Sequence, residues 1–411
     1  MTKRKPMPSV DEMQVKSTVD AALGLDNLAR SVGGGSVDGG SVLDEVMGFC
    51  LDYIAYPDGD SPYAHALWIG HTWLADLLFT TPRLCFTSPE KRSGKTRAEE
   101  VTSLFVPNPV NVVSVSPAYL FRKIQDKPDG HLPCIGIDEV DALFTGKPSE
   151  STEQIRGILN AGYRKGATVG RAEATRNGDV NTVEMPVFAP VYLAGIGDMP
   201  DTVADRSIIV HMKRRRPDCK LQPYRERTAA KQSEPIRARL AAWSDQVRPI
   251  LEAYEDKDYP VMPDSIQDRD ADVWEPLFIV AQLAGGKWPE IAASIAPRIV
   301  AAQHAEPQSI GERLLRDIRD VFGESASMFR MELIDSLQNI DGSPWRTLGR
   351  TGDGIDSNYL TKTLRKYDVA RDYGGKAHSI RINGVTNYGY YRSDFTDAWS
   401  RYLPEPVNTP L

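Results

Sequence analysis

The chain has 411 residues, of which 41% are hydrophobic and 26% are charged, and its formal net charge is −7. This composition is typical of a globular protein with two or three domains, and it excludes a disordered chain and a polycation. A nucleic acid would therefore have to bind to local basic patches rather than to the bulk charge of the protein.

The cysteines and the N-terminus bear on the cellular compartment. Cys50, Cys85, Cys134 and Cys219 are scattered, without the paired spacing of a zinc site or a disulfide framework. No apolar run approaches the about 18 residues that a membrane span needs. The basic N-terminus is not followed by an apolar core, so it does not resemble a secretory signal. These features predict a cytoplasmic protein without a membrane partner.

Composition divides the chain into four predicted parts. Residues 1–41 are an N-terminal segment that ends in a Gly- and Ser-rich linker, and 42–224 form an α/β core. Residues 225–308 have the apolar periodicity of a helical lid. Residues 309–411 begin with a connecting helix and continue as a separate small domain.

Within the core, short apolar runs alternate with helical patterns. Strands are predicted at residues 84–87, 110–115, 134–137, 187–194 and 208–212. This alternation predicts a mostly parallel sheet with helices on its faces.

A candidate phosphate-binding loop follows the first predicted strand. The nine residues that end at Thr96 read Ser-Pro-Glu-Lys-Arg-Ser-Gly-Lys-Thr, and a predicted helix follows them. The loop amides, at Ser93 and Gly94 among others, would bind the phosphates of ATP, and Lys95 would reach the outer ones. The Thr96 hydroxyl would hold Mg²⁺. Pro89 occupies the place of the motif's first glycine, so the backbone must have another shape there. A plain surface loop is the alternative.

Two carboxylates end the strand at 134–137. Asp138 would complete the Mg²⁺ shell, and Glu139 would orient and polarise the attacking water. The alternative is a strand end followed by a charged turn. The next strand leads to Asp198, which is a candidate sensor of the γ-phosphate or, alternatively, a cap of the following segment.

Arg206 stands immediately before the last predicted strand of the core. Ring-forming ATPases present an arginine finger from this place to the nucleotide of the neighbouring subunit, where it stabilises charge on the transferring phosphoryl group. A surface salt bridge to Asp201 or Asp205 is the alternative.

Several segments together carry a resemblance to a known family. They lie at 88–97, 115–122, 159–164, 194–198, 204–207 and 268–277. Through them, residues 42–300 resemble a domain-of-unknown-function ATPase family of actinobacteria, their phages and mobile elements, which Pro89 also fits. The layout is similar to AAA+ ATPases and superfamily 3 helicases. The resemblance implies a P-loop NTPase fold, and suggests Arg269 in the lid as a second arginine on the nucleotide. Arg269 could equally pair with a neighbouring aspartate.

Two features of the core point to nucleic acid. Two β-prone arms flank an Asn-Gly pair at 177–178, which is a strong hairpin signal. Helicase-like rings carry a pore hairpin at this place, so Arg171 and Arg176 are candidate contacts for strand phosphates. A surface hairpin with solvated arginines is the alternative. The basic run at 213–216 could meet phosphate or a neighbouring subunit, although such runs are usually solvated.

The C-terminal domain has the pattern of a winged helix. Helical apolar spacing is found at 331–338 and 359–367, and Asp356 is placed to cap the second helix. An Asn-Gly pair at 383–384 predicts a hairpin wing. From 362 to 381 there are six basic residues against two acidic ones, as expected of a DNA-binding surface. The candidate DNA contacts are Lys362, Arg365, Lys366 and Arg381. A protein-binding winged helix is the alternative.

Taken together, these patterns predict an ATP-hydrolysing DNA motor or replication initiator that forms a homo-oligomeric ring, for example a hexamer. ATP and Mg²⁺ are the expected cofactors and DNA the expected partner. A nucleotide-dependent switch that regulates DNA or protein binding without unwinding is the main alternative. A small-molecule P-loop kinase is a weaker one, since it has no need of Arg206, the hairpin or the winged helix.

Overall fold

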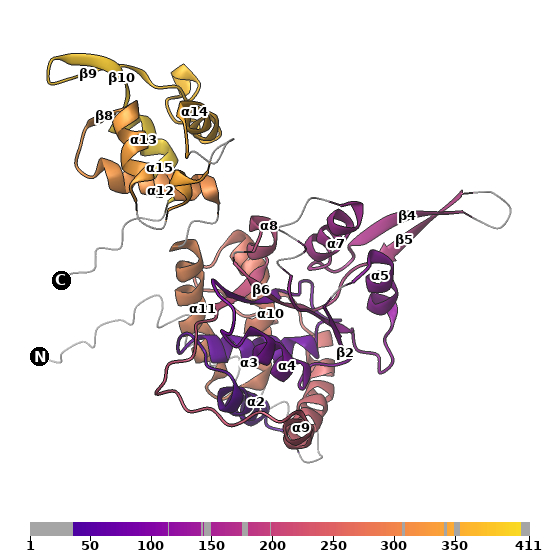
Figure 1. Ribbon diagram of the computed structural model, residues 1–411. Helices are drawn as coiled ribbons and strands as arrows, with labels where there is room; N and C mark the ends of the chain where they lie inside the picture. The colour runs from indigo at the N-terminus through magenta and orange to yellow at the C-terminus, as the bar shows by residue number, and fades with distance from the viewer. Residues whose placement is uncertain are drawn as a thin grey trace, which may run out of the picture. The chain divides into compact units, whose positions relative to one another are not determined.

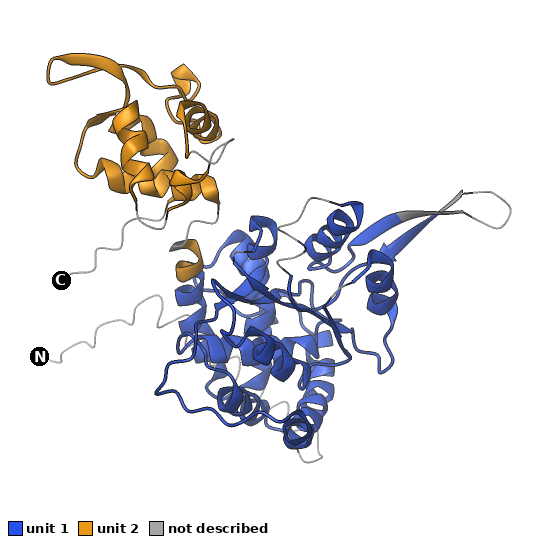
Figure 2. Ribbon diagram, in the orientation of Figure 1, with its two compact units in different colours: residues 1–300 blue, residues 301–411 orange. Residues whose placement is uncertain are grey.

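The structure of the chain is a computed structural model that falls into two compact units, residues 1–300 and 301–411 (Figure 2). It describes residues 36–113, 115–140, 143, 149–174, 180–197, 199–305, 309–340, 343–348 and 354–403. Most of the predicted N-terminal segment therefore lies outside the described residues. Where the chain is described, no helix combines the length and the apolar character that crossing a membrane requires.

Unit 1 alternates strands and helices and then continues as helices alone (Figure 1). Its elements are α2 (Gly39–Tyr53), α3 (Ser61–Thr72), β1 (Arg83–Ser88), α4 (Lys95–Ser103), β2 (Pro109–Val112), α5 (Pro117–Gln125), β3 (Cys134–Ile137), α7 (Glu150–Ala161), β4 (Thr168–Ala174), β5 (Val180–Pro186), β6 (Val191–Ile196), α8 (Asp201–Ala204), β7 (Ser207–His211), α9 (Glu226–Glu252), η1 (Asp256–Asp258), α10 (Asp268–Ala284) and α11 (Trp288–Ala305).

The central sheet of unit 1 has five parallel strands in the order β2-β3-β6-β1-β7. The predicted α/β fold with a parallel sheet is thus confirmed. One predicted strand, 187–194, is shifted in the structure and begins at Val191. Pro190 precedes it and has no N–H group to donate to a neighbouring strand.

Side chains alternate along each central strand between two apolar layers. Leu84 and Phe86 of β1 join the core on one face, while Cys85 between them joins the core on the other. The first layer contains α2, α3, α4 and α9–α11, and the second contains α5 and α7. The sheet is therefore covered on both faces, as a parallel sheet requires.

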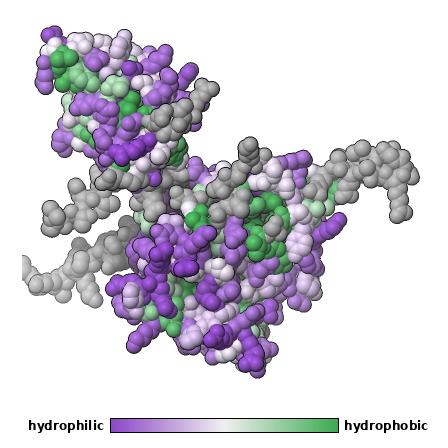
Figure 3. Space-filling view, in the orientation of Figure 1, coloured by the Kyte–Doolittle hydropathy of each residue, from purple (hydrophilic) through white to green (hydrophobic). Residues whose placement is uncertain are grey.

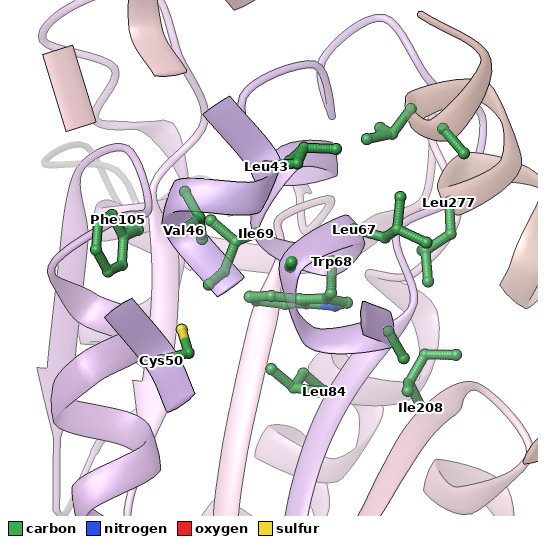
Figure 4. Close-up of a cluster of buried hydrophobic side chains, with 14 of the residues drawn as sticks. Leu43, Val46, Cys50, Leu67, Trp68, Ile69, Leu84, Phe105, Ile208 and Leu277 are labelled. Atoms are coloured by element: carbon green, nitrogen blue, oxygen red, sulfur yellow. The ribbon is translucent and has the colours of Figure 1, made fainter. Parts of the chain in front are cut away.

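The helices assigned to a lid share one core with the helices that precede the sheet. Figure 4 shows the Trp68 ring of α3 among Leu67, Leu84 of β1 and Leu277 of α10, and all of these side chains are buried. Because this core is continuous, α9 and α10 are packed against α2 and α3 as part of unit 1.

The start of α2 differs from the expectation of a linker. Gly39 and Gly40, which composition assigns to the Gly-rich stretch, are buried in the first turn, and Asp38 caps it by accepting a hydrogen bond from the Gly40 amide. A Cβ at Gly39 would lie 2.2 Å from Trp243 Nε1 and 2.8 Å from Ala284 Cα. Only glycine fits here, because Trp243 and Ala284 pack closely against this position. Both residues are far from Gly39 in the sequence, so the local composition does not reveal the contact.

We expect the Gly39→Ala variant to be less stable, because its new methyl group overlaps with Trp243. Overpacking of this kind costs about 1–3 kcal/mol in free energy of unfolding, which chemical denaturation would measure. Gly48 of the same helix is the matched control, since no atom lies within 4 Å of a Cβ placed there. Gly48→Ala should raise stability by up to about 1 kcal/mol through helix propensity. Equal effects at the two positions would contradict the packing argument.

Unit 2 is a small domain with its own core. Its elements are α12 (Ile310–Phe322), β8 (Ser327–Phe329), α13 (Arg330–Gln338), η2 (Pro344–Arg346), α14 (Ser357–Arg365), η3 (Arg371–Tyr373), β9 (His378–Ile382), β10 (Val385–Tyr391), η4 (Arg392–Phe395) and α15 (Thr396–Tyr402). The strands form one antiparallel sheet in the order β8-β10-β9. Asp356 caps α14 by accepting a hydrogen bond from the Tyr359 amide at 2.7 Å, as its position before the helix predicts.

Candidate functional site

The Gly-Lys-Thr loop connects the carboxyl end of β1 to the first residue of α4. Gly94 has φ +87° and precedes the helix directly, and Arg92 has φ +66°. These left-handed residues turn the chain sharply before α4 begins at Lys95. The loop therefore stands at the N-terminus of a helix, where unpaired amides and the helix dipole favour an anion.

Lys95 is buried within this loop. Its Nζ donates hydrogen bonds to Ser88 Oγ and to the Glu90 carbonyl oxygen, the latter at 3.3 Å. The Glu90 carbonyl also accepts from Ser88 Oγ at 2.6 Å and from Ser93 Oγ at 2.8 Å. Ser88 and Ser93 thus organise the loop around one carbonyl, although Pro89 replaces the glycine of the motif. The lysine ammonium is held on the inner side of the loop.

Thr96 and Asp138 meet across the sheet edge. Thr96 lies in the first turn of α4, after β1, and Asp138 follows β3; β6 separates these two strands, but all three are parallel and end at the same edge. Thr96 Oγ1 donates to Asp138 Oδ2 at 3.3 Å, and the Glu139 amide donates to Asp138 Oδ1 at 2.8 Å. Glu139 has φ +54° and is exposed. The structure therefore brings together the two oxygen donors predicted for Mg²⁺ and places Glu139 beside them.

These donors match the chemistry of magnesium. Mg²⁺ binds hard oxygen ligands and is usually held by one or two carboxylates, with water and substrate phosphates completing the shell. The Thr96 hydroxyl and the Asp138 carboxylate provide oxygen donors of this kind. No group of three or more His, Cys, Asp or Glu side chains in the described ranges could hold a metal alone. A cation here would thus need further ligands besides these side chains, such as water.

Glu99 is a residue that motif reasoning missed. It follows Lys95 by four residues on α4 and is buried, and it forms no ion pair within the part of the chain that the structure describes. Burial, together with the smaller effects of the negative charges of Asp138 and Glu100, raises the pKa of the Glu99 carboxyl from 4.5 to about 8. The i,i+4 spacing from Lys95 could have pointed to this side chain, but its burial depends on the packed sheet.

We expect the free energy of unfolding to fall as pH rises through the range in which the Glu99 carboxyl is ionised in the unfolded protein but still protonated in the folded protein. This range extends from the unfolded pKa near 4.5 to the folded pKa of about 8. Glu99→Gln removes the penalty, so the variant should melt above the wild type at about pH 9, with the difference shrinking toward about pH 5. The exposed Glu234 of α9, which is not among the charges that act on Glu99, provides the control Glu234→Gln. A difference between Glu99→Gln and wild type that does not change with pH would contradict the assignment.

Arg206 and Arg269 lie at the opposite edge of the sheet from the loop. Arg206 directly precedes β7, which runs parallel to β1. The five residues of β7, at about 3.3 Å each, therefore separate Arg206 from the sheet edge that carries the loop. Its guanidinium donates to the Thr202 carbonyl and stacks over the Tyr163 ring at 5.0 Å. Arg269 pairs with Asp205 at 2.5 Å, and not with the aspartates next to it in sequence. The structure therefore does not bring either arginine to the loop of its own chain.

The two arms of the predicted hairpin pair as a two-stranded ribbon. β4 and β5 pair over their full length and project from the body of unit 1 (Figure 1). Arg171 lies in β4, while Arg176 and the candidate sensor Asp198 lie outside the described residues. In the basic run at 213–216, Arg214 pairs with Glu90 of the Gly-Lys-Thr loop at 2.6 Å. The run therefore starts beside the candidate nucleotide site.

The predicted cations of unit 2 are all exposed. They are Lys362 and Arg365 on α14, Lys366 directly after it and Arg381 on β9. Within the part of the chain that the structure describes, none of these four side chains forms an ion pair. Unpaired, exposed cations are free to meet phosphate groups.

Comparisons with known proteins identify relatives for part of the chain. Residues 211–402 match the family model described as "Protein of unknown function (DUF3631)". The segment for which the sequence suggests a family resemblance, 42–300, shares only residues 211–300 with this match. Two solved structures show a slight likeness, "The A form apo structure of NrS-1 C terminal region-CTR" and the same region "CTR(305-718)". They are 10% and 11% identical, with TM-scores of 0.37 and 0.34, and each alignment covers 85% of this chain and 75% of the other.

A sequence relative is closer. The "Uncharacterized 28.9 kDa protein in xis 5'region" of Saccharopolyspora erythraea is 37% identical over 196 residues. That alignment covers 47% of this chain and 69% of the relative. At this identity and coverage, the chain belongs to the same family as the Saccharopolyspora erythraea protein.

Proposed function

We propose that this chain is a P-loop ATPase that works as a ring-forming DNA motor of helicase type or as a replication initiator. The single observation that carries the proposal is the contact between Thr96 and Asp138, which belong to distant motifs and meet at one sheet edge. Ligands bind in open α/β sheets outside the carboxyl ends of the strands, which is where this contact lies.

Each residue of the site has a proposed task. The amides of Ser93 and Gly94 and the ammonium of Lys95 bind and orient the phosphates of ATP. Thr96 and Asp138 would hold Mg²⁺, which supplies charge neutralisation on the phosphate oxygens when bound. Glu139 accepts a proton from the attacking water or orients it, since its exposed carboxylate follows Asp138 directly. Asp198 is proposed as the polar sensor after β6.

A second copy of the chain would complete the site. Arg206 stands at the edge of the sheet remote from its own loop, so it can stabilise a transferring phosphoryl group only in a neighbouring subunit. Arg269 lies at the same edge through its pair with Asp205 and is proposed to act in that interface. A ring, for example a hexamer, satisfies this requirement at every site, because head-to-tail contacts close on themselves.

Two regions would contact DNA. The β4–β5 ribbon is proposed to carry one strand through Arg171 and Arg176. The order of elements in unit 2 is helix, strand, two helices and a hairpin, from α12 to β10, which supports a winged helix with α14 as the recognition helix. Its exposed cations would bind the DNA backbone.

Turnover in the presence of DNA separates the motor from its main alternative. We expect steady-state ATP hydrolysis by the full chain to rise when single-stranded DNA is added, because a motor couples hydrolysis to movement along a strand. Turnover that is the same with and without single-stranded or duplex DNA would favour the nucleotide-dependent switch instead. The Gly-Lys-Thr loop and Asp138 serve both functions, so the response to DNA is the deciding observation.

A further inference from the structure

Unit 2 exposes several large apolar side chains. Val385 and Tyr388 of β10 are 59% and 58% exposed, and Met331 at the start of α13 is 53% exposed. Figure 3 shows hydrophobic residues at the surface where the β9–β10 hairpin lies. Val385 and Tyr388 are three positions apart on β10 and lie on opposite faces of the hairpin, so each face exposes its own apolar side chain.

The two faces of the hairpin differ in chemistry. Tyr388 pairs with Ser379 and Thr386 pairs with Arg381, so Tyr388 and Arg381 are diagonal neighbours on one face. The opposite face carries His378, which stacks on Tyr373 at 4.4 Å between ring centroids and lies 5.4 Å from the Tyr391 ring. His378 also pairs with Asp394 at 2.9 Å. The second face is therefore occupied around His378 by contacts within the protein, although Val385 at its far end is exposed, whereas the Tyr388 face carries an open aromatic ring.

Positive charge surrounds Tyr388. The Arg330 guanidinium lies over its ring at 6.0 Å, and Arg330 Nε has no hydrogen-bond acceptor in the described part of the chain. Tyr390 lies on the same face as Tyr388, and its hydroxyl donates to the Gly375 carbonyl at 3.1 Å and also lies beside the Thr361 side chain of α14. Arg365 follows Thr361 by four residues, on the same side of that helix. The open ring is thus bordered by Arg330, Arg381 and the exposed end of α14.

We propose that this face of unit 2, defined by Tyr388, Arg330 and Arg381, binds the unpaired bases of single-stranded DNA. The inference rests on the proposed function, in which DNA is the ligand. Aromatic rings flanked by cations are the usual surface for single strands, because every base can stack while its phosphates meet the cations. Bases inside a duplex are stacked on one another and reach Tyr388 only after unpairing. The face therefore favours the open strand over the duplex.

Fluorescence anisotropy of the full chain, without added nucleotide, tests the proposal. The probes are a labelled oligothymidine of about 20 nucleotides, longer than a typical single-strand binding site, and a duplex of the same length. Tyr388→Ala should weaken single-strand binding about 5- to 150-fold, the range for losing one stacked base, and leave duplex binding unchanged. Tyr388→Phe should keep the wild-type affinity, since the ring is retained. Thermal unfolding checks that both variants fold.

Tyr373→Ala is the matched control, because this exposed tyrosine touches the opposite face of the hairpin. It should bind the single strand as the wild type does. Unchanged single-strand affinity in Tyr388→Ala, or an equal loss for strand and duplex, would overturn the inference while leaving the ATPase proposal intact. A wild type that binds neither probe would overturn this inference and the DNA-binding part of the proposed function together. ATP turnover, measured separately, would show whether the ATPase proposal survives.

Discussion

Lys95→Ala should hydrolyse ATP at least about 10²–10³-fold more slowly than the wild type, the usual loss when one preorganised charge on the reacting group is removed. The Lys95 ammonium is buried on the inner side of the loop, where it is held by Ser88 and Glu90. Alanine leaves that place without a positive charge for the outer phosphates. Steady-state phosphate release at saturating Mg²⁺ and ATP measures the effect.

Lys91 supplies the control for this prediction. It lies in the same loop but is exposed, so Lys91→Ala changes the net charge by the same amount without emptying the inner side of the loop. Lys91→Ala should therefore turn over ATP as the wild type does. Equal losses in the two variants would show that general charge, and not the buried ammonium, supports hydrolysis.

Arg206→Ala should lose turnover by about 10³–10⁵-fold, the range measured for arginine fingers. Because Arg206 stands at the sheet edge remote from its own loop, the defect would arise in the neighbouring subunit. The variant should still bind ATP, since its own Gly-Lys-Thr loop is intact. Arg216→Ala is a control, because Arg216 is exposed and pairs locally with Asp218. A fully active Arg206→Ala would rule out the finger.

Mixing the two inactive variants gives a sharper test of the shared site. In a mixed assembly, Arg206→Ala contributes an intact loop and Lys95→Ala contributes an intact arginine. Some interfaces would then contain both groups, and turnover should reappear on mixing although each variant alone is inactive. Failure to recover any activity, in a mixture shown to co-assemble, would contradict an arginine that acts between subunits.

The fold was largely predictable because local patterns encode it. The strand 134–137 is found with the same bounds, and the cap at Asp356 forms as expected, since short apolar runs and capping residues act locally. Gly39 shows the limit of composition, because a glycine-rich stretch looks the same whether it is a linker or packs against Trp243.

The candidate site was predictable only in part. The Thr96–Asp138 contact follows from motifs at the ends of parallel strands. The pair between Arg269 and Asp205 joins residues 64 positions apart, so no neighbour in the sequence indicates it. The burial of Glu99 likewise arises only when α4 packs on the sheet. Such contacts depend on tertiary packing, which overrides local preference.

Equilibrium binding of ATP, with and without Mg²⁺, tests the central claim most directly. Calorimetry of the wild type and Lys95→Ala would measure it without relying on hydrolysis or DNA. We predict that the wild type binds ATP, that Mg²⁺ strengthens binding through Thr96 and Asp138, and that Lys95→Ala binds much more weakly. Absence of ATP binding by the folded wild type would contradict the account and would indicate that Pro89 gives the loop a shape unable to hold phosphate.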